Sequence, residues 1–290
     1  MIQAQHIKPK LTPKVDKPPV KIVVPEMNIE AIPTAMRRMG WTVAAALMER
    51  WFASPEWTMP PSWKDSTLGP GPGPATDVDS RCIDDEIVTM KWALCFRRCN
   101  KIVAQLRHKI DNEAAVLLLN KRLTQATWDQ RSNIDLGWAD MTAREIDQVC
   151  QVNATKMGSS LDPLDDMYGA LGIATVKVGL IGEAMLDPVT GRRVFHATRA
   201  GFYIRDQYDF NGEQFLGAWT ENGVLSKLQM IANSFSDSYV YQWHGEAIGM
   251  VFNHHFGRFR RNNNRGGDFL IYSDVHWIDI DLPIELGRSP

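Results

Sequence analysis

Apolar side chains recur at helical spacing through the first half of the chain. A helix is predicted to begin near Thr34, whose hydroxyl can cap the first turn, because two apolar rows step by four residues from there. These rows are Met39, Val43, Leu47 and Trp51, and beside them Met36, Gly40, Ala44, Met48 and Phe52. Together they form an apolar face too wide for a free surface helix, so this face is expected to pack against other elements.

Further helices are predicted between residues 84 and 157. An apolar seam that steps by four and three predicts one long helix over residues 84–110, and residues 112–123 form another candidate. Thr142 and Glu145 have the form of a capping box, in which each side chain satisfies a free backbone N–H, so a helix should begin there. The seam of the long helix is Val88, Trp92, Cys95, Cys99, Ile102 and Leu106. Residues 28–160 are therefore expected to be a helical region.

Proline, glycine and tryptophan mark the irregular stretches. Residues 1–27 interleave lysines with prolines, which favour extended backbone, so we expect a flexible Pro/Lys-rich leader. Trp57 and Trp63 are expected to pin residues 54–63 onto the core, and the Gly-Pro repeat at 69–74 predicts a loop.

Strand-like alternation replaces the helical spacing in the second half. Val176, Val178 and Leu180 alternate, residues 187–191 have turn chemistry, and residues 194–208 read as a second strand closed by a turn at 209–212. Residues 224–231 could form one short helix, and residues 239–243 and 269–280 return to alternation. The expected fold class is α+β, with a helical N-terminal region and a mostly antiparallel β region over residues 161–290.

Composition and charge exclude several classes. The 290 residues are 44% hydrophobic and 23% charged, with 34 acidic against 32 basic side chains, so wholly disordered and collagen-like chains are excluded. A net charge of −2 gives no global field that would recruit nucleic acid or anionic lipid, and nucleic acid is not an expected partner. The N-terminus lacks the basic and apolar segments of a signal peptide, so synthesis in the cytoplasm without one is expected. Cys95 and Cys99 lack a zinc-site pattern and are expected to be packing thiols.

Several segments carry a family resemblance. They are residues 39–41 (MGW), 51–55 (WFASP), 87–92 (IVTMKW), 201–212 (GFYIRDQYDFNG), 216–219 (LGAW) and 266–275 (GGDFLIYSDV). From about residue 34 to 286, the chain resembles a family of bacterial proteins of unknown function encoded near type VI secretion genes. The resemblance implies an antibacterial effector that secretion spike or adaptor proteins deliver into a target cell. The periplasm is the favoured compartment of that cell. It also implies a cognate immunity protein.

A narrower likeness lies in the four residues from Asp206 to Asp209. This Asp-Gln-Tyr-Asp sequence resembles the Asp-x-Tyr-Asp core of colicin M-type bacteriocins, and the likeness implies magnesium-assisted hydrolysis of the lipid-linked peptidoglycan precursor. On a strand, Asp206 and Tyr208 share a face, and Asp209 joins them only if the chain bends. Two carboxylates there could hold Mg²⁺ beside a substrate phosphate, or one could activate water that Tyr208 orients.

The chain also departs from the colicin M pattern. That pattern continues to a His-Arg pair, which residues 213–219 lack, although His254, His255 or His276 with Arg258 could replace it from another strand. The alternative interpretation of residues 206–212 is an ordinary strand end, in which Asp209 accepts turn hydrogen bonds and Gly212 has a positive φ.

A dense basic patch covers residues 253–265. Arg258, Arg260, Arg261 and Arg265, with Phe256 and Phe259, could grip phosphates, or they could belong to a solvated basic loop before a buried strand. A nuclease would use His254 or His255 as general base and Asp268 or Asp274 as metal ligand. A binuclear metal site from His254, His255, His276 and Asp279 is disfavoured, because adjacent residues of a strand point to opposite faces.

The predicted function is therefore an antibacterial effector that hydrolyses a phosphate-containing cell-envelope precursor with the help of magnesium. Asp206 and Asp209 would bind the metal or activate the water, and Tyr208 would orient the water. Arg258 or Arg260 would neutralise the charge of the phosphate. One alternative is a non-catalytic effector that perturbs or perforates the membrane with the apolar faces of residues 36–52 and 88–106. A nuclease and a secretion-associated adaptor are further alternatives.

Overall fold

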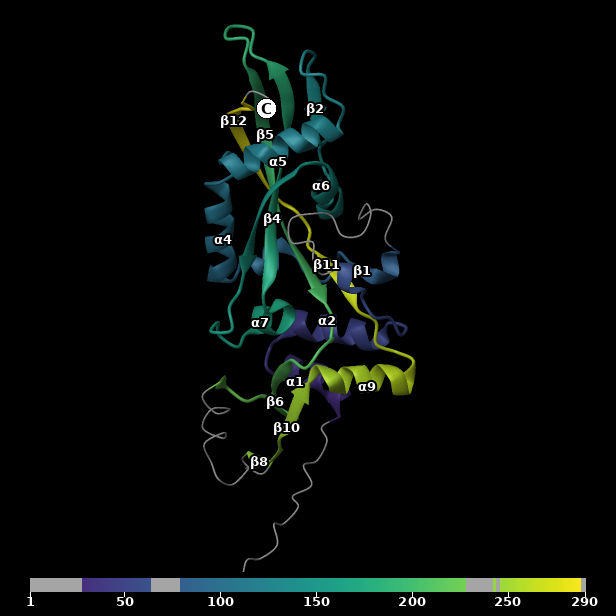
Figure 1. Cartoon of the computed structure of the whole chain (residues 1–290). Coiled ribbons are helices and arrows are strands. Elements are labelled where there is room, and N and C mark those ends of the chain that lie inside the picture. Colours follow the sequence, from purple (N-terminus) through teal and green to yellow (C-terminus); the bar gives the residue numbers. More distant parts are fainter. Residues whose placement is uncertain (1–27, 64–78, 228–241, 244–245, 288–290) are drawn as a thin grey trace, which may run out of the picture.

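A computed structural model describes residues 28–63, 79–227, 242–243 and 246–287 (Figure 1). The predicted leader at 1–27 and the Gly-Pro loop at 69–74 lie outside the described residues. The α+β prediction is confirmed, because helices dominate the first half and most strands come from the second half. Within the described residues, no helix is both long enough and apolar enough to cross a membrane.

One mixed sheet forms the centre of the fold, in the order β1-β11-β5-β4-β2, with β12 also paired to β5 and β3 to β4. All of its pairs are antiparallel except β1 with β11. Its longest strands are β4 (Ala174–Leu186) and β5 (Arg193–Tyr208), joined by the predicted turn, where the Asp187 carboxylate accepts the N–H groups of Val189 and Thr190. The other strands are β1 (Ile83–Asp84), β2 (Ile134–Leu136), β3 (Gln151–Met157), β11 (Phe269–Tyr272) and β12 (His276–Glu285).

The alternating stretch at 269–280 forms two strands rather than one. The break begins at Ser273, whose hydroxyl accepts the N–H of Ile204 and whose own N–H donates to the Ile204 carbonyl. Next to it, the Asp274 carboxylate accepts the N–H of Met90. These bonds turn the chain, so that β11 pairs with the end of β5 and β12 with its earlier residues.

A smaller sheet lies beyond the end of β5, in the order β10-β6-β7. It consists of β6 (Phe215–Thr220), β7 (Gly223–Val224) and β10 (Gly249–Phe252), and a further pair is β8 (Gln242–Trp243) with β9 (Glu246–Ala247). Val224 was predicted to start a helix and instead ends β7; residues 228–231 of that predicted helix lie outside the described residues.

The first predicted helix is two helices. A 3-10 turn (Ile29–Ala31) leads into α1 (Ile32–Arg38), which has Pro33 in its first turn, so the helix begins before Thr34. Gly40 then takes a φ of +79°, which ends α1 and lets α2 (Thr42–Ala53) start in a new direction. The Asp166 carboxylate accepts the N–H groups of Val43 and Ala44, so a distant residue caps α2.

The long helix predicted over residues 84–110 is also interrupted. This stretch folds instead as β1, α3 (Met90–Ala93) and α4 (Arg97–Arg107). Phe96 separates the two helices, because its backbone is extended and its ring packs 5.2 Å from that of Trp92. The seam survives within α4, where Cys99 and Leu106 are buried. Cys95 lies in the break and is exposed, so its predicted packing role is wrong.

The remaining predictions for the first half divide into confirmed helices and unforeseen strands. Asn112 caps α5 (Glu113–Gln125), and Thr142 and Glu145 make both bonds of the predicted capping box at α6 (Ala143–Val149). However, β2 and β3 lie inside the expected helical region, where both pair with β4. Only three residues form β2, and β3 is polar at Asn153, Thr155 and Lys156, which leaves too short or too weak an apolar pattern.

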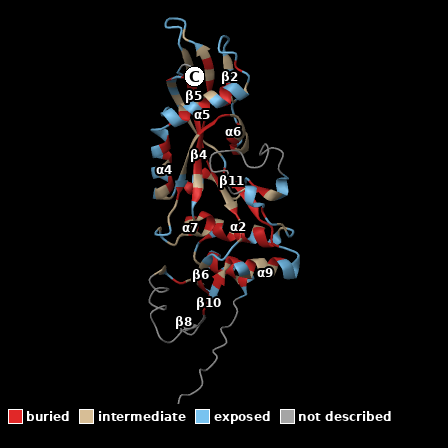
Figure 2. Ribbon diagram, in the orientation of Figure 1, coloured by how far each residue is buried: buried red, intermediate tan, exposed pale blue. Residues whose placement is uncertain are grey.

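The helices form two groups around the sheet. Helices α4, α5 and α6 pack against β3 and β4, whereas α1, α2, α7 (Asp166–Leu171) and α9 (Asn253–Asn263) lie toward the end where β5 finishes (Figure 1). Trp57 and Trp63 pack against this core, as predicted, and Trp63 is the last residue of a short 3-10 turn, Pro61–Trp63. Another 3-10 turn, Ser80–Cys82, precedes β1. Buried residues run continuously from Ile29 to Leu286, so the predicted regions 28–160 and 161–290 share one core (Figure 2).

Candidate functional site

The end of β5 brings the three residues of the Asp-x-Tyr-Asp segment to one pocket. Asp206 and Tyr208 lie on the same face of the strand, opposite Ile271 and Phe269 of β11. The Tyr208 ring stacks on Phe269 with centroids 5.0 Å apart, which fixes its position. Asp209 follows directly after the strand, and all three residues line the same cavity.

The turn after β5 has the geometry that either interpretation required. The Asp209 carboxylate accepts a hydrogen bond from the backbone N–H of Asn211 at 3.2 Å and another from its side-chain amide at 2.8 Å. Gly212 has a φ of +82°. The turn chemistry is therefore confirmed, and it also bends the chain so that Asp209 reaches the pocket that Asp206 lines.

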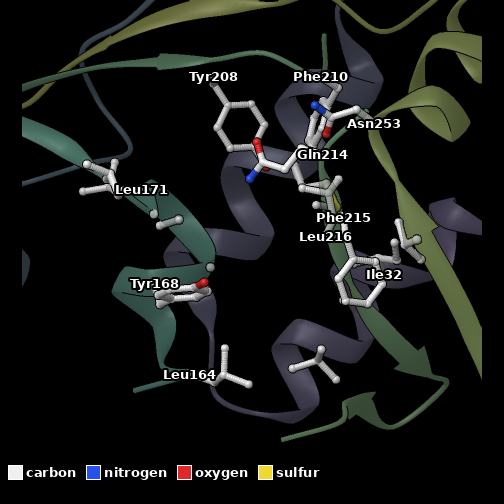
Figure 3. A pocket seen from close by; sticks show the side chains of 18 of the residues that line it. Ile32, Leu164, Tyr168, Leu171, Tyr208, Phe210, Gln214, Phe215, Leu216 and Asn253 are labelled. Carbon is white, nitrogen blue, oxygen red and sulfur yellow. The ribbon is translucent and has the colours of Figure 1, made fainter. Parts of the chain in front are cut away.

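The pocket has a volume of about 880 Å³ and lies between the end of β5, the small sheet, and helices α1, α2 and α7. Figure 3 shows Tyr168, Leu164 and Leu171 on one side of the cavity, Asn253, Gln214, Leu216 and Ile32 on the other, and Tyr208 at one end. Most of the lining is apolar. The polar side chains that line it are Asp206, Gln207, Tyr208, Asp209, Asn211, Gln214, Asn253, Tyr168, Ser159, Ser160 and Lys227. The cavity thus combines a mostly apolar lining with polar groups on more than one side.

The two carboxylates have different surroundings. Burial raises the pKa of Asp206 well above its usual range, and the negative charge of nearby Asp209 raises it further. Burial also raises the pKa of Tyr208, so its phenol stays protonated. Asp206 is nevertheless only half-buried and reaches the cavity. Asp209, in contrast, accepts the turn hydrogen bonds of Asn211. A carboxyl group with a raised pKa, such as that of Asp206, is suited to donating a proton in a reaction.

The basic patch is a helix rather than a loop or strand, and its arginines do not line the pocket. Asn253–Asn263 form α9, which ends at Asn264 with a φ of +51°. Phe256 and Arg260, four residues apart, face the core, where Arg260 is buried and donates to Asp268 and Thr58. Arg258 lies on the exposed side of α9. The phosphate role predicted for Arg258 and Arg260 therefore has no support from the pocket geometry.

Four of the polar lining residues, Lys227, Tyr168, Gln214 and Asn253, were given no role in the sequence analysis. Lys227 is the only lysine or arginine among the described residues that line the pocket, and its ammonium lies 4.5 Å from the centre of the Tyr168 ring. Gln214 follows the turn, and Asn253 starts α9 and donates to the Asn211 carbonyl at 2.7 Å. No local motif marks these positions, because the fold brings them together from separate segments.

The groups considered for a nuclease have structural partners. Asp268 is buried and accepts hydrogen bonds from the Trp51 indole, the Met59 N–H and Arg260, and Asp274 accepts the Met90 N–H. The ring nitrogen Nδ1 of His255 accepts the Phe252 N–H, and His254 pairs with Glu213. His276 begins β12 opposite Phe202. None of these groups lines the pocket.

Magnesium at Asp206 and Asp209 stays a prediction. Among residues 28–63, 79–227, 242–243 and 246–287, no group of three or more His, Cys, Asp or Glu side chains is placed to hold a metal ion. Magnesium usually keeps several waters and takes one or two protein carboxylates together with substrate phosphates. The two aspartates fit that smaller donor set, which a substrate phosphate would have to complete.

A second concentration of ionisable groups is buried under α6, away from the pocket lining. The Asp147 carboxylate accepts hydrogen bonds from Lys177 and Tyr203, each at 2.6 Å, and from Tyr272 at 3.2 Å. Arg205 lies 3.8 Å from the same carboxylate and donates to the Tyr272 hydroxyl. All five side chains are buried, so we assign this cluster to holding α6 on the sheet.

A family described as "Family of unknown function (DUF6402)" matches residues 27–287. No curated protein and no solved structure matches the chain.

Proposed function

Because this chain belongs to the DUF6402 family of unknown function, we propose its function from its pocket: it is an antibacterial effector that hydrolyses a phosphate-containing, lipid-linked precursor of the cell envelope. The observation that carries the proposal is that Asp206, Tyr208 and Asp209 line the same, mostly apolar pocket. Export by a contractile, type VI-like machine and a cognate immunity protein are parts of the same proposal.

The lining favours an amphipathic ligand. Ligand pockets are typically apolar, with a few placed polar groups that orient the ligand. Here Leu164, Leu171 and Leu216 offer contact to a hydrocarbon chain, while Gln214 and Asn253 offer amide groups to a polar headgroup. Lys227, whose ammonium donates to the backbone carbonyls of Ser160 and Asp162, would supply the positive charge for a phosphate that was first expected from Arg258 or Arg260.

The carboxylate pair supplies the chemistry. Asp209 accepts a proton from water as the water oxygen attacks phosphorus, and the phosphorus–oxygen bond to the leaving group breaks. Asp206, whose pKa is raised, donates its proton to the leaving oxygen. The products are an alcohol and a phosphate. Asp209 then releases its proton to solvent and Asp206 takes one up, which restores both carboxyl groups. Tyr208 donates a hydrogen bond that orients the water or a phosphate oxygen.

Magnesium is a separate part of the proposal. When it enters with the substrate phosphate, Asp206 and Asp209 would hold it, and it would supply neutralisation of the phosphate charge. Hydrolysis that continues in EDTA would restrict the proposal to the acid–base chemistry of the two carboxyl groups.

The rival functions have less support. The apolar faces of residues 36–52 and 88–106, which a membrane-inserting toxin would use, are largely buried in the core. The carboxylates that a nuclease would use, Asp268 and Asp274, accept structural hydrogen bonds. An adaptor would not need two carboxyl groups in a pocket, and it would not be toxic in any compartment.

The test is expression in a target bacterium with and without a periplasmic export signal. We expect the exported chain to stop growth and its lipid-linked precursor to be cleaved. Asp206→Asn and Asp209→Asn should each abolish both effects, because each removes one proton-transfer group while preserving side-chain shape.

Glu213→Gln is the matched control. Glu213 is an exposed carboxylate four residues after Asp209 and does not line the pocket, so its variant should remain toxic. Thermal unfolding would verify that all three variants are folded. Full toxicity of both aspartate variants would overturn the proposal, and rapid depolarisation without precursor cleavage would favour the membrane-perturbing alternative.

A further inference from the structure

The net charge of −2 conceals a strongly basic helix. Between Thr89 and Ile110 the sequence contains no aspartate or glutamate and has lysine or arginine at positions 91, 97, 98, 101, 107 and 109. Most of these residues belong to α4 or follow it directly. A local positive field therefore exists although the whole molecule has none.

The charges of α4 gather on its outer face. Cys99, Val103 and Leu106 are buried against the sheet, and 100° per residue places Arg97 and Lys101 on the opposite side. Both are exposed, as are Arg107 and Lys109. Arg98 differs, because it binds Asp165 in a two-bond ion pair at the start of α7. Two acidic side chains at the start of α4, Asp162 and Asp165, are thus already paired with Arg98.

Exposed apolar side chains lie next to the same end of α4. Leu161 is 88% exposed in the loop that Arg98 anchors, and Ile173, at the end of α7, is 55% exposed. Gly158 and Ile173 are neighbours, since a Cβ on Gly158 would lie 3.2 Å from the Cα of Ile173. Figure 1 shows the start of α4 just above α7, where Arg98 binds Asp165. The start of the basic helix therefore lies close to the segments that carry Leu161 and Ile173.

This corner adjoins the pocket. Ser159, Ser160 and Leu164, from the loop that carries Leu161, line the cavity, and so does Ile173 itself. An apolar side chain that enters the acyl layer here would bring the cavity close to the lipid surface.

We propose that the outer face of α4, with Leu161 and Ile173, is a docking surface for a membrane rich in anionic phospholipid. Arg97 and Lys101 attract the phosphate headgroups, and the two apolar side chains insert among the upper acyl carbons. This docking surface deepens the proposed function. It rests on that function in one respect, because a lipid-linked substrate favours a membrane over another polyanion as the ligand of the basic face. It differs from membrane perforation, because no buried face has to open.

The test is co-sedimentation of the full chain with vesicles of phosphatidylglycerol and phosphatidylcholine in equal parts, and with phosphatidylcholine alone. We expect binding only to the anionic vesicles, weakened when salt rises from about 0.1 M to 1 M, because salt screens exposed charges. Each cation near an anionic surface contributes about fivefold in partitioning, so Arg97→Glu with Lys101→Glu should lower binding at least ~20-fold. Glutamate at position 97 begins α4, where a negative charge suits the helix dipole.

The matched control reverses two exposed cations on other helices, Lys121→Glu in α5 and Arg261→Glu in α9. It changes the net charge equally and should bind nearly as the wild type does. Leu161→Ser with Ile173→Ser should lower vesicle binding but leave any binding to a single-stranded oligonucleotide unchanged. Equal binding by the α4 variant and the control would overturn the inference, as would tight oligonucleotide binding without vesicle binding.

The outcomes also separate this inference from the proposed function. Vesicle binding requires no hydrolysis, so Asp206→Asn should sediment with anionic vesicles like the wild type. If the wild-type chain binds vesicles but cleaves no precursor, only the proposed hydrolase activity is refuted. Unchanged vesicle binding of the α4 variant would refute only the docking surface.

Discussion

Asp147→Asn should destabilise the fold more than the removal of any exposed carboxylate. The Asp147 carboxylate lies against both Lys177 and Arg205, and all three side chains are buried. Asparagine keeps the shape and can still accept the hydrogen bond from Tyr203. It removes the negative charge that compensates two buried cations.

The expected cost is about 3–5 kcal/mol, the usual cost of removing one partner of a buried ion pair. Burial lowers the pKa of Lys177 while the charge of Asp147 raises it, so asparagine at position 147 should lower that pKa further. The unfolded chain then binds more protons than the folded chain between the folded pKa of Lys177 and its normal value. The stability of the variant should therefore rise with pH across that window.

Urea unfolding followed by circular dichroism measures this cost, with exposed Asp111→Asn as the control. Lys177→Met in the Asp147→Asn background removes one uncompensated cation, so the double variant should be more stable than the sum of the single changes predicts. A loss below about 1 kcal/mol for Asp147→Asn would refute the reasoning, because a buried charge cluster cannot lose its anion at that cost. Additive effects in the double variant would refute the coupling with Lys177.

Three further predictions concern local features. Thr142→Ala removes the hydroxyl from the capping box of α6 and should cost about 1 kcal/mol in urea unfolding. Gly266→Ala places a Cβ 2.5 Å from the Trp51 ring at a φ of +101°, so thermal unfolding should show a loss of about 2–4 kcal/mol. Burial raises the pKa of Cys150 from 9.0 to about 12. The contribution of the buried thiol to the free energy of unfolding is therefore complete below pH 9 and is lost as pH rises toward 12. At pH 10.5 this loss should reach about 2 kcal/mol, and Cys150→Ala should lack it.

Features that depend on a few consecutive residues were predicted well. The capping box at Thr142 and Glu145, the turn at Asp187, and the long strand that ends at Tyr208 all form as expected. Each depends on a bond or an alternation that is complete within its own segment. Their stabilising contacts can therefore be inferred from spacing alone.

Features that depend on distant partners were not predicted. The apolar spacing from Val88 to Leu106 continues through a break in the helix. A single extended residue such as Phe96 does not disturb a pattern with a period of 3.6 residues, so the spacing gave no sign of the break. Likewise, Asp166 caps α2 across more than 120 positions of the chain. The charge cluster at Asp147 was missed for the same reason, since its partners come from three strands that the sequence does not align.

The candidate site combines both kinds of feature, and this decides how it should be tested. The hydrogen bonds that Asp209 accepts from Asn211 are local, but the position of Asp209 beside Asp206 in a pocket depends on α7 and the small sheet. Alanine at position 209 would remove the turn bonds and the charge together, so loss of activity would not separate a collapsed turn from lost chemistry. Asparagine keeps an oxygen that accepts the turn bonds and removes only the charge. Since the charge of Asp209 also raises the pKa of Asp206, Asp209→Asn should lower that pKa while the turn stays intact.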